Sequence, residues 1–330
     1  MERNWKQIIA VFLLGFMMPG FAIRVGSMFM RVPGTAETQP SDTVETTASS
    51  QAVQSGKFFV PVLMNNGTVQ VMELESYLLG VLLGEVPPSF EMEALKAQAV
   101  VARTYTLYCT NARDKHVGAA VCTDSTCCQS YYSAKDYLAA GGRQSDVEKV
   151  RSAIAQTKDQ ILTYEGNVIL AAYFSCSGGR TEDAVAVWGS EVPYLQSVES
   201  PGEEQAQVFT NTVYYTSEEF AALLGRTLAS EPASWIGPAT YTNGGGVALM
   251  AVAGRSYTGT ELRRLLSLNS TAFTMTADSG GIYITTTGKG HRVGMSQYGA
   301  DAMAVLGSSY TQILMHYYQG TRIDKIDAIR

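Results

Sequence analysis

The stretch Gly80–Tyr105, GVLLGEVPPSFEMEALKAQAVVARTY, holds one carboxylate, Glu85, at the end of an apolar run and just before Pro87-Pro88. The run Tyr77–Leu83 predicts a helix packed into a core. Because a residue that precedes proline is pushed out of helical geometry, this helix should end near Glu85 or Val86. A carboxyl group held there against apolar surface is expected to have a raised pKa, so it can keep a proton for an acid step. The alternative is a surface glutamate at a helix end.

The residues around this stretch predict two helices and a hairpin. The helices cover about 74–85 and 91–112, and the second repeats small and apolar residues near helical spacing. Before them, residues 58–64 and 68–72 read as two strands joined by the turn Asn65-Asn66-Gly67.

Further along the chain, helices and strands do not alternate regularly. Residues 147–157 predict a helix, and 160–164 with 167–174 predict a second hairpin across Glu165-Gly166. Short helices are also expected at Ser217–Leu224, Thr260–Leu268 and Ser296–Leu306. This order predicts an α+β fold of mixed helices and short antiparallel hairpins. We expect the fold to surround an extended substrate groove near Glu85 and to be preceded by an N-terminal membrane anchor. A boundary inside the folded part is possible near residue 200, at Glu199–Gly202.

The composition sets limits on the class of protein. The chain has 330 residues, a net charge of −6 and 46% hydrophobic residues, which is enough for one large or two medium domains. The balance is mildly acidic, and there is no basic tail or stripe, so nucleic acid is not an expected partner.

The N-terminus predicts export. An apolar run at residues 8–23 lies between Arg3, Lys6 and Arg24. It can be a secretory signal peptide or an uncleaved anchor, and the poor cleavage site after it favours the anchor. Residues 1–32 are therefore interpreted as a cytoplasmic stub and signal-anchor helix, and residues 33–57, rich in Ser, Thr, Glu and Gln, as a flexible polar tether. Residues 58–330 are interpreted as the exported folded region, which would carry the catalytic or binding site.

A loop rich in cysteine and histidine follows the second helix. His116, Cys122, Cys127 and Cys128 lie within HVGAAVCTDSTCCQ, and thiolate and imidazole are the preferred zinc donors. The alternative is a disulfide, because an exported chain meets an oxidising compartment. Cys122 with one of the two adjacent cysteines, or Cys109 with Cys176, are the plausible pairs. Spacing alone leaves zinc and disulfide open.

Two glycine-rich loops are candidates for ligand contact. In residues 173–181, YFSCSGGRT, the glycines permit close approach to the backbone and the hydroxyls of Ser175 and Ser177 could bind sugar hydroxyls. In residues 288–299, GKGHRVGMSQYG, glycines flank His291, which suits an imidazole presented to a ligand. The first of these loops could instead be an ordinary turn. His316 is expected to be a satisfied helix histidine.

Five segments in this order resemble the stage II sporulation protein D family. They are GEVPPSFEMEALKAQAVVARTY, HVGAAVCTDSTCCQSY, AAYFSCSGGRTEDA, PYLQSVESPGEE and GKGHRVGMSQYGA, and the resemblance covers roughly residues 60 to 320. It implies a lytic transglycosylase, a carbon–oxygen lyase that cleaves the bond between N-acetylmuramic acid and N-acetylglucosamine in denuded glycan strands of peptidoglycan. The 6-hydroxyl of the muramic acid attacks its own C1 and leaves a 1,6-anhydro end, so one acid is enough.

The resemblance also implies roles for single residues. Glu85 matches the catalytic glutamate, which protonates the leaving oxygen and then accepts the proton of the 6-hydroxyl. The residues implied to bind substrate are Arg103, Tyr105, Tyr173, Ser175, Ser177, Gly178, Gly179, Tyr194, His291, Gln297 and Tyr298. Some members carry zinc in the loop that corresponds to His116–Cys128, which favours zinc over a disulfide and gives it a structural role.

The family's setting is engulfment of the forespore by the mother cell during sporulation. The implied location is the mother-cell membrane, with the catalytic region outside and facing the septum. The implied partners are stage II sporulation protein P, an amidase and endopeptidase that bares the glycan, and stage II sporulation protein M. Two competing hypotheses are a non-catalytic peptidoglycan-binding activator of an amidase and a zinc hydrolase built on the cysteine loop.

Three positions depart from the family's pattern. Arg292 stands where a glycine is usual, Gln196 where a lysine is often found, and Cys127 where a histidine is common. The first could change how the last loop meets the sugar, the second removes a positive charge, and the third leaves the identity of the fourth metal ligand open.

Overall fold

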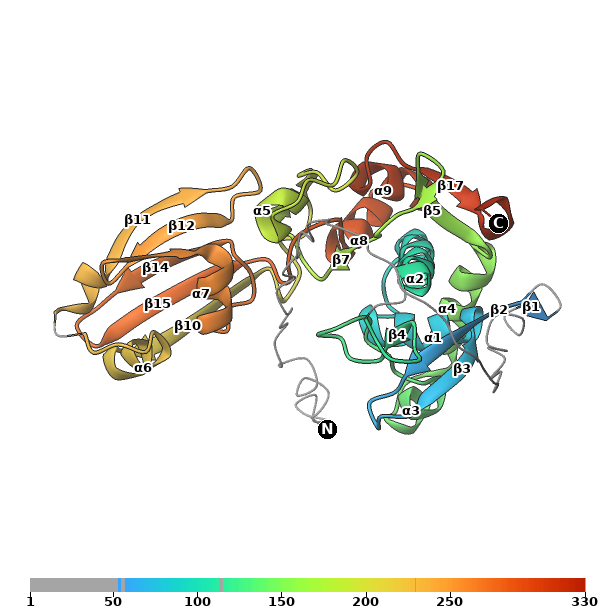
Figure 1. Ribbon diagram of the computed structural model, residues 1–330, viewed down its shortest axis with the longest axis horizontal. Helices are drawn as coiled ribbons and strands as arrows, with labels where there is room; N and C mark the ends of the chain where they lie inside the picture. Colours follow the sequence, from blue (N-terminus) through green and yellow to red (C-terminus); the bar gives the residue numbers. More distant parts are fainter. Residues whose placement is uncertain (1–52, 55–56, 113–114, 229, 330) are drawn as a thin grey trace, which may run out of the picture.

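The computed structural model describes residues 53–54, 57–112, 115–228 and 230–329. Over these residues the chain forms two lobes that lie side by side in Figure 1. The first lobe contains both ends of the described chain, and the second is formed by the residues from β10 (Thr210–Thr216) to β15 (Gly281–Thr287). A hydrophobic cluster inside the second lobe is separate from the two clusters of the first.

The first lobe begins with the predicted hairpin and the two predicted helices. Strands β2 (Lys57–Leu63) and β3 (Val69–Glu73) pair antiparallel, and α1 (Leu74–Glu85) and α2 (Met92–Ala112) follow. The Glu73 side chain caps α1 by accepting a hydrogen bond from the Ser76 amide. At the other end Val86 is extended, as expected for a residue before proline. The prediction that this helix ends near Glu85 or Val86 is confirmed.

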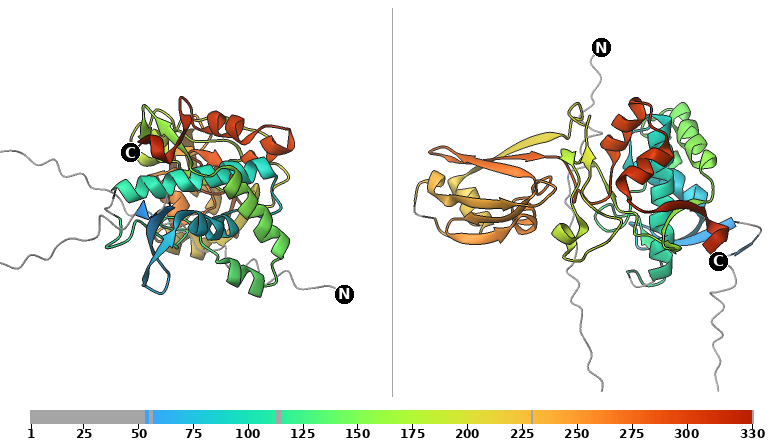
Figure 2. Two further views of the ribbon diagram at one scale, coloured as in Figure 1. Left: turned by 90° about the vertical axis from the view of Figure 1, so that its right-hand side faces the viewer. Right: turned by 90° about the horizontal axis from the view of Figure 1, so that it is seen from above.

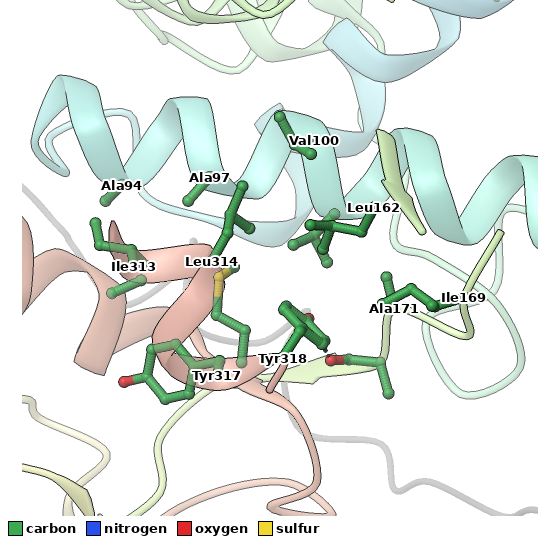
Figure 3. Close-up of a cluster of buried hydrophobic side chains, with 14 of the residues drawn as sticks. Ala94, Ala97, Val100, Leu162, Ile169, Ala171, Ile313, Leu314, Tyr317 and Tyr318 are labelled. Atoms are coloured by element: carbon green, nitrogen blue, oxygen red, sulfur yellow. Dashed lines mark hydrogen bonds between the residues drawn. The ribbon is translucent and has the colours of Figure 1, made fainter. Parts of the chain in front are cut away.

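Helix α2 runs through the first lobe and packs on elements from several parts of the chain. Figure 3 shows Ala94, Ala97 and Val100 of α2 beside Ile313 and Leu314 of α9 (Tyr310–Tyr317). The small side chains on this face of α2 allow the close approach of the other helix. The second face of α2 packs on α1 and on α4 (Gln144–Gln156).

The segment after α4 differs in part from the prediction. Strand β5 (Gln160–Tyr164) pairs with β6 (Asn167–Val168), so the hairpin across Glu165-Gly166 forms, but its second arm is only two residues long. The prediction of a strand to residue 174 is wrong there, because β7 (Tyr173–Phe174) leaves this sheet and pairs in parallel with β16 (Met295–Ser296). The other neighbour of β5 is β17 (Arg322–Lys325), close to the C-terminus.

The second lobe contains two three-stranded antiparallel sheets with the orders β10-β15-β14 and β11-β12-β13. Its elements are β10, α6 (Ser217–Leu223), a 3-10 helix (Pro232–Trp235), β11 (Ile236–Tyr241), β12 (Val247–Val252), β13 (Arg255–Thr258), α7 (Gly259–Leu265), β14 (Phe273–Ala277) and β15. Sequence analysis considered a single boundary near residue 200. In the structure the chain enters this lobe at β10 and returns to the first lobe after β15 (Figure 2).

The remaining elements are short. They are β1 (Val53–Gln54), β4 (Val121–Cys122), α3 (Ala134–Ala139), β8 (Gly179–Arg180), α5 (Ala184–Trp188), β9 (Glu199–Ser200), α8 (Gln297–Val305) and a 3-10 helix (Ile326–Ile329). Mixed helices and mainly antiparallel short strands confirm the predicted α+β class.

The predicted anchor, residues 1–32, and most of the predicted tether, residues 33–57, lie outside the described residues. Near the end of the tether, β1 pairs with Lys57-Phe58 at the start of β2. Among the helices of the described part, none combines the length and the apolar character that a membrane crossing requires.

Candidate active site

Glu85 is half-buried at the last turn of α1 and is surrounded by neutral hydrogen-bond donors. Its Oε1 accepts a hydrogen bond from the Ser130 amide at 2.5 Å, and its Oε2 accepts one from the Gln297 side chain at 3.3 Å. The Tyr173 hydroxyl is a further hydrogen-bonding neighbour. Ser130, Gln297 and Tyr173 come from three distant parts of the chain, so the tertiary fold builds the surroundings of this carboxyl group.

Burial raises the pKa of Glu85 from its ordinary value of 4.5 to about 7. The hydrogen bonds from Ser130, Gln297 and Tyr173 favour the ionised form and lower the pKa, but the loss of solvent is the larger effect. A carboxyl group with a pKa near 7 is present in both protonation states close to neutral pH. It can therefore donate a proton and take one back.

Two glycines of α1 admit the segment that carries Ser130. A Cβ on Gly84 would lie 2.9 Å from Ser130 Oγ and 3.0 Å from the Tyr131 amide nitrogen, and a Cβ on Gly80 would overlap the Tyr131 ring. The Tyr131 ring stacks on that of Tyr77, with centroids 5.8 Å apart. Ser130 was not predicted from the sequence as a neighbour of Glu85. Two glycines four residues apart on one helix face were the available signal, because such a pair leaves room for a crossing chain.

Gln129 links this segment to the rest of the site. Its amide nitrogen donates to Tyr77 Oη at 3.2 Å and to Thr106 Oγ1 at 3.0 Å, and its Oε1 accepts from the Tyr173 hydroxyl at 3.2 Å. All polar atoms of this wholly buried side chain are therefore paired. Gln129 fixes the Tyr173 hydroxyl close to Glu85 and is a second residue that sequence analysis did not single out.

Helix α8 supplies the third side of the site. Ser296 caps the helix by accepting a hydrogen bond from the Gly299 amide at 3.2 Å, which places Gln297 in the first turn. The next residue, Tyr298, is half-buried, and its ring meets that of Phe90 edge-on with centroids 5.1 Å apart. Phe90 belongs to the turn after Pro87-Pro88, so α8 packs on the chain that leaves Glu85.

The four predicted metal ligands come together in the structure. The ligand atoms of His116, Cys122, Cys127 and Cys128 all lie within 4.8 Å of one another. His116 Nε2 is 3.3 Å from Cys128 Sγ and 3.7 Å from Cys127 Sγ. In a tetrahedral zinc site with ordinary bond lengths, neighbouring donor atoms are about 3.5–3.8 Å apart. One nitrogen and three sulfur donors at these distances fit zinc, and the disulfide pairs considered for the sequence are not formed, because all five cysteines are free.

A local turn brings these ligands back toward each other. Cys122 is fixed in β4, which pairs in parallel with β2. Asp124 then accepts hydrogen bonds from the Thr126 amide and hydroxyl, and its carbonyl accepts from the amides of Cys127 and Cys128. Hydrogen bonding with Cys122, followed by that with His116, lowers the pKa of Cys128 to about 4, which favours a thiolate there. Ser130, whose amide binds Glu85, is only two residues from Cys128, so one short segment connects the cysteine cluster to Glu85.

Arg103 lies in the core and not at a surface. Its side chain is 0% exposed, and its guanidinium group forms a bidentate ion pair with Glu75, at 2.9 and 2.6 Å. It also donates to the Gln160 carbonyl at 3.1 Å. In this structure Arg103 ties α1, α2 and β5 together. Tyr105, two residues along α2, lies beside Cys109 and Cys128, so it faces the cysteine cluster.

The glycine loop after β7 is held from inside the protein. Glu203, which is buried, accepts hydrogen bonds at its Oε2 from the Ser177 amide at 2.7 Å, the Ser177 hydroxyl at 2.9 Å and the Gly178 amide at 2.9 Å. Cys176 Sγ is 3.1 Å from the same oxygen. Ser177 was predicted to bind substrate, but in the structure its amide and hydroxyl bind the buried Glu203 and so stabilise the loop. Ser175 is half-buried, and Gly178 and Gly179 have positive φ, of 76° and 105°.

His291 and Tyr194 both contact other parts of the protein. The His291 ring is between those of Phe174 and Trp188, with each centroid 5.6 Å away, and its Nδ1 accepts from the Val293 amide. Burial lowers the pKa of His291 to about 3, so the ring is neutral at neutral pH. The Tyr194 hydroxyl accepts from the Leu170 amide at 3.1 Å. The roles assigned to these residues in substrate binding stay predictions.

The extended groove around Glu85 also stays a prediction. Two pockets at the start of α1 share Glu73, Glu75 and Lys158 in their linings, and neither includes Glu85.

Of the departures from the family's pattern, Gln196 is exposed and donates to the Pro193 carbonyl, and Cys127 is part of the cysteine cluster. His316 Nε2 donates a hydrogen bond to the Glu199 carbonyl at 2.7 Å, so the ring is paired as expected.

Comparisons with known proteins point to one family. The family described as "Stage II sporulation protein" matches residues 64–164, which include Glu85, α2 and the cysteine cluster. The chain is 37% identical over 316 residues to stage II sporulation protein D of Bacillus amyloliquefaciens, an alignment that covers 93% of this chain and 90% of the relative. The chain belongs to the stage II sporulation protein D family.

Other relatives extend the comparison. The chain is 36% identical to stage II sporulation protein D of Bacillus subtilis over 84% of its own length and 82% of the relative's. It is also 30% identical to a Bacillus subtilis protein called amidase enhancer, over 74% of this chain and 40% of that protein. The resemblance inferred from the five sequence segments is therefore confirmed.

Proposed function

We propose that the chain is a lytic transglycosylase that cleaves the bond between N-acetylmuramic acid and N-acetylglucosamine in denuded glycan strands of peptidoglycan. Glu85, with its pKa of about 7, protonates the glycosidic oxygen of the leaving sugar. The 6-hydroxyl of the muramic acid attacks C1, its proton passes to the Glu85 carboxylate, and a 1,6-anhydro end forms. No water is consumed, and Glu85 ends the cycle protonated.

The observation that carries this proposal is the environment of Glu85. A single carboxyl group is held by Ser130, Gln297 and Tyr173, all of them neutral partners, and its pKa is near neutrality. Ordinary glycoside hydrolysis uses two carboxylates, whereas internal attack by a substrate hydroxyl uses one group as acid and then as base. Membership of the sporulation family supports a cell-wall substrate of this kind.

The test is product analysis after incubation of residues 57–330 with denuded glycan strands. Wild-type protein is expected to produce 1,6-anhydro ends, and Glu85→Ala is expected to reduce the rate by about a hundredfold or more. Reducing ends that carry oxygen from labelled water would contradict the internal attack. Glu91→Ala is a matched control, because Glu91 is exposed in the turn between α1 and α2.

The second candidate function is a non-catalytic, peptidoglycan-binding activator of an amidase. The similarity to the protein called amidase enhancer favours it. Two measurements separate these functions. If the chain is only an activator, Glu85→Ala still stimulates the amidase, and the wild-type protein by itself leaves glycan strands intact.

The geometry of His116, Cys122, Cys127 and Cys128 supports a structural zinc site in the proposed enzyme. All four positions have protein ligands, which is typical of structural zinc, whereas catalytic zinc keeps one position for water or substrate. The bound ion would fix the loop that leads to Ser130, and activity that depends on Glu85 but resists brief chelation would exclude a zinc hydrolase.

The proposed setting is engulfment during sporulation. An N-terminal signal anchor would hold the catalytic region at the outer face of the mother-cell membrane, toward the forespore septum. Stage II sporulation protein P would bare the glycan, and stage II sporulation protein M would be the second partner. Co-purification of both proteins with the full-length chain from sporulating cells, and loss of membrane fractionation when residues 1–32 are removed, test this setting.

A further inference from the structure

The two lobes meet at a buried ion pair between Arg292 and Glu182. The side chains are 2% and 1% exposed, and Arg292 Nη1 lies 3.2 Å from Glu182 Oε1. Arg292 is in the loop between β15 and β16, through which the chain returns from the second lobe, and Glu182 follows β8 in the first lobe. Their backbones are joined as well, because the Glu182 amide donates to the Arg292 carbonyl at 2.6 Å.

Both members of the pair bind the tip of a hairpin in the second lobe. Glu182 Oε1 accepts hydrogen bonds from the Gly246 amide at 2.9 Å and from the Thr242 hydroxyl at 2.8 Å. Arg292 Nη2 donates to the Gly244 carbonyl at 2.6 Å. These three residues form the turn between β11 and β12. The turn is therefore held to the first lobe by charge-assisted hydrogen bonds from both ions.

The glycines of that turn leave room for the carboxylate. A Cβ on Gly244 would lie 2.5 Å from Glu182 Oε2, and one on Gly246 would overlap Glu182 Oε1. Such approaches are closer than real carbon–oxygen contacts allow, so the turn can dock in this way only because both positions lack a side chain.

On its other side, Arg292 holds the glycine loop of the candidate site. Its Nε donates to the Ser177 carbonyl at 2.7 Å, and its Nη2 donates to the Arg180 carbonyl at 2.8 Å. Glu203 binds the amides of Ser177 and Gly178 from below. The loop that follows Tyr173 and Phe174 is thus fixed by a carboxylate at its amides and by a guanidinium group at its carbonyls.

The backbone of Arg292 shows what these contacts must offset. Its φ is +66°, in the left-handed region that is sterically unfavourable for a residue with a side chain. Such a conformation persists where the surroundings over-determine it, and it points to a function. A buried ion pair adds little net stability compared with apolar residues, so its main effect is to fix one geometry.

We propose that Arg292 and Glu182 form a latch that holds the second lobe against the Ser177–Arg180 loop and so positions this loop for glycan binding. The pair is a positioning device and does not touch the reacting atoms. Since Ser130 and Gln297 hold Glu85 from within the first lobe, opening the latch should weaken binding of the strand more than it slows the proton transfer. The second part of this inference rests on the proposed function, and the first does not.

The first experiment measures hydrogen exchange at the amide of Gly246 in the exported chain. Arg292→Gly, which removes the side chain and relieves the backbone, is expected to accelerate this exchange at least tenfold, and Arg292→Lys less. Arg226→Gly is the matched control, because Arg226 is exposed and donates to the Ala253 carbonyl within the second lobe. Unchanged exchange in Arg292→Gly would overturn the latch.

Two further variants cover a failure of Arg292→Gly to fold. Arg292→Gly combined with Glu182→Gln leaves no uncompensated buried charge, and Gly246→Ala forces the hairpin tip away from the other lobe. Both are expected to show the same faster exchange at the tip of the hairpin, between β11 and β12. Wild-type protection in both folded variants would contradict the latch.

The second experiment measures kcat and KM for denuded glycan strands. In Arg292→Gly we expect KM to rise about tenfold and kcat to stay within about threefold, with partial recovery in Arg292→Lys. A fall in kcat with KM unchanged would overturn the positioning role. If wild-type protein forms no product, the proposed function has failed, while the exchange measurement still decides on the latch.

Discussion

Replacement of Glu85 by glutamine tests the physical basis of the site without any substrate. Glutamine has the shape of the protonated acid and cannot ionise. Burial raises the pKa of Glu85 from 4.5 to about 7, so the folded state holds its proton more tightly than the unfolded chain. The stability that this proton gives is present below pH 4.5 and is lost as the pH rises through 7.

The size of the effect follows from these two pKa values. Each tenfold difference in proton affinity corresponds to ~1.4 kcal/mol, so ionisation of Glu85 should cost the wild-type protein about 3 kcal/mol of unfolding free energy between pH 4 and pH 8. Glu85→Gln does not have this cost. Its stability relative to wild type should therefore increase by about 3 kcal/mol over the same range.

The assay is urea unfolding of residues 57–330 at several pH values, with both proteins compared at each pH. Glu261→Gln is the matched control, since the Glu261 carboxylate belongs to a capping box and its hydrogen bonds with Thr258 lower its pKa. Its stability contribution is present above the unfolded pKa and is lost as the pH falls, so the sign is opposite. If the difference between wild type and Glu85→Gln did not change with pH, the raised pKa and the acid role derived from it would be refuted.

Three other substitutions test separate parts of the structure. Gly84→Ala should displace Ser130 and lower the free energy of unfolding by ~1–3 kcal/mol. It should also remove a hydrogen bond that lowers the pKa of Glu85, so the pH–rate profile is expected to shift to higher pH. A gain in stability would show that the helix has room for a methyl group. Cys122→Ser should abolish zinc binding in elemental analysis and lower the midpoint of thermal unfolding by ~5 °C or more, and wild-type protein without zinc would refute the site. Gln98→Leu should stabilise the protein by ~1–3 kcal/mol in urea unfolding, because neither amide atom of this buried side chain has a hydrogen-bond partner among the described residues. Destabilisation would show that the amide is paired through water.

Several features followed from the sequence because short stretches of chain decide them. The end of α1 at Glu85 follows from the proline two residues later, and the β2–β3 turn follows from Asn66-Gly67. The grouping of His116 with the cysteines could be predicted since all four residues lie within thirteen positions of one another. In each case the deciding residues are neighbours in the chain, so steric limits or chemical type are enough.

Other features depended on contacts between distant residues. The sequence suggested Arg103 as a groove residue, but its charge is buried against Glu75, and Ser177 binds Glu203 beneath the loop. Ser130 and Gln297, two partners of Glu85, are 45 and 212 residues away from it in the sequence, and the second lobe, from β10 to β15, interrupts the first lobe. A buried charge or hydroxyl takes whichever partner the packing brings to it, because an unpaired group costs several kcal/mol. The sequence alone determined that an acid stands at the end of a buried helix, and only the tertiary structure decided which groups surround it.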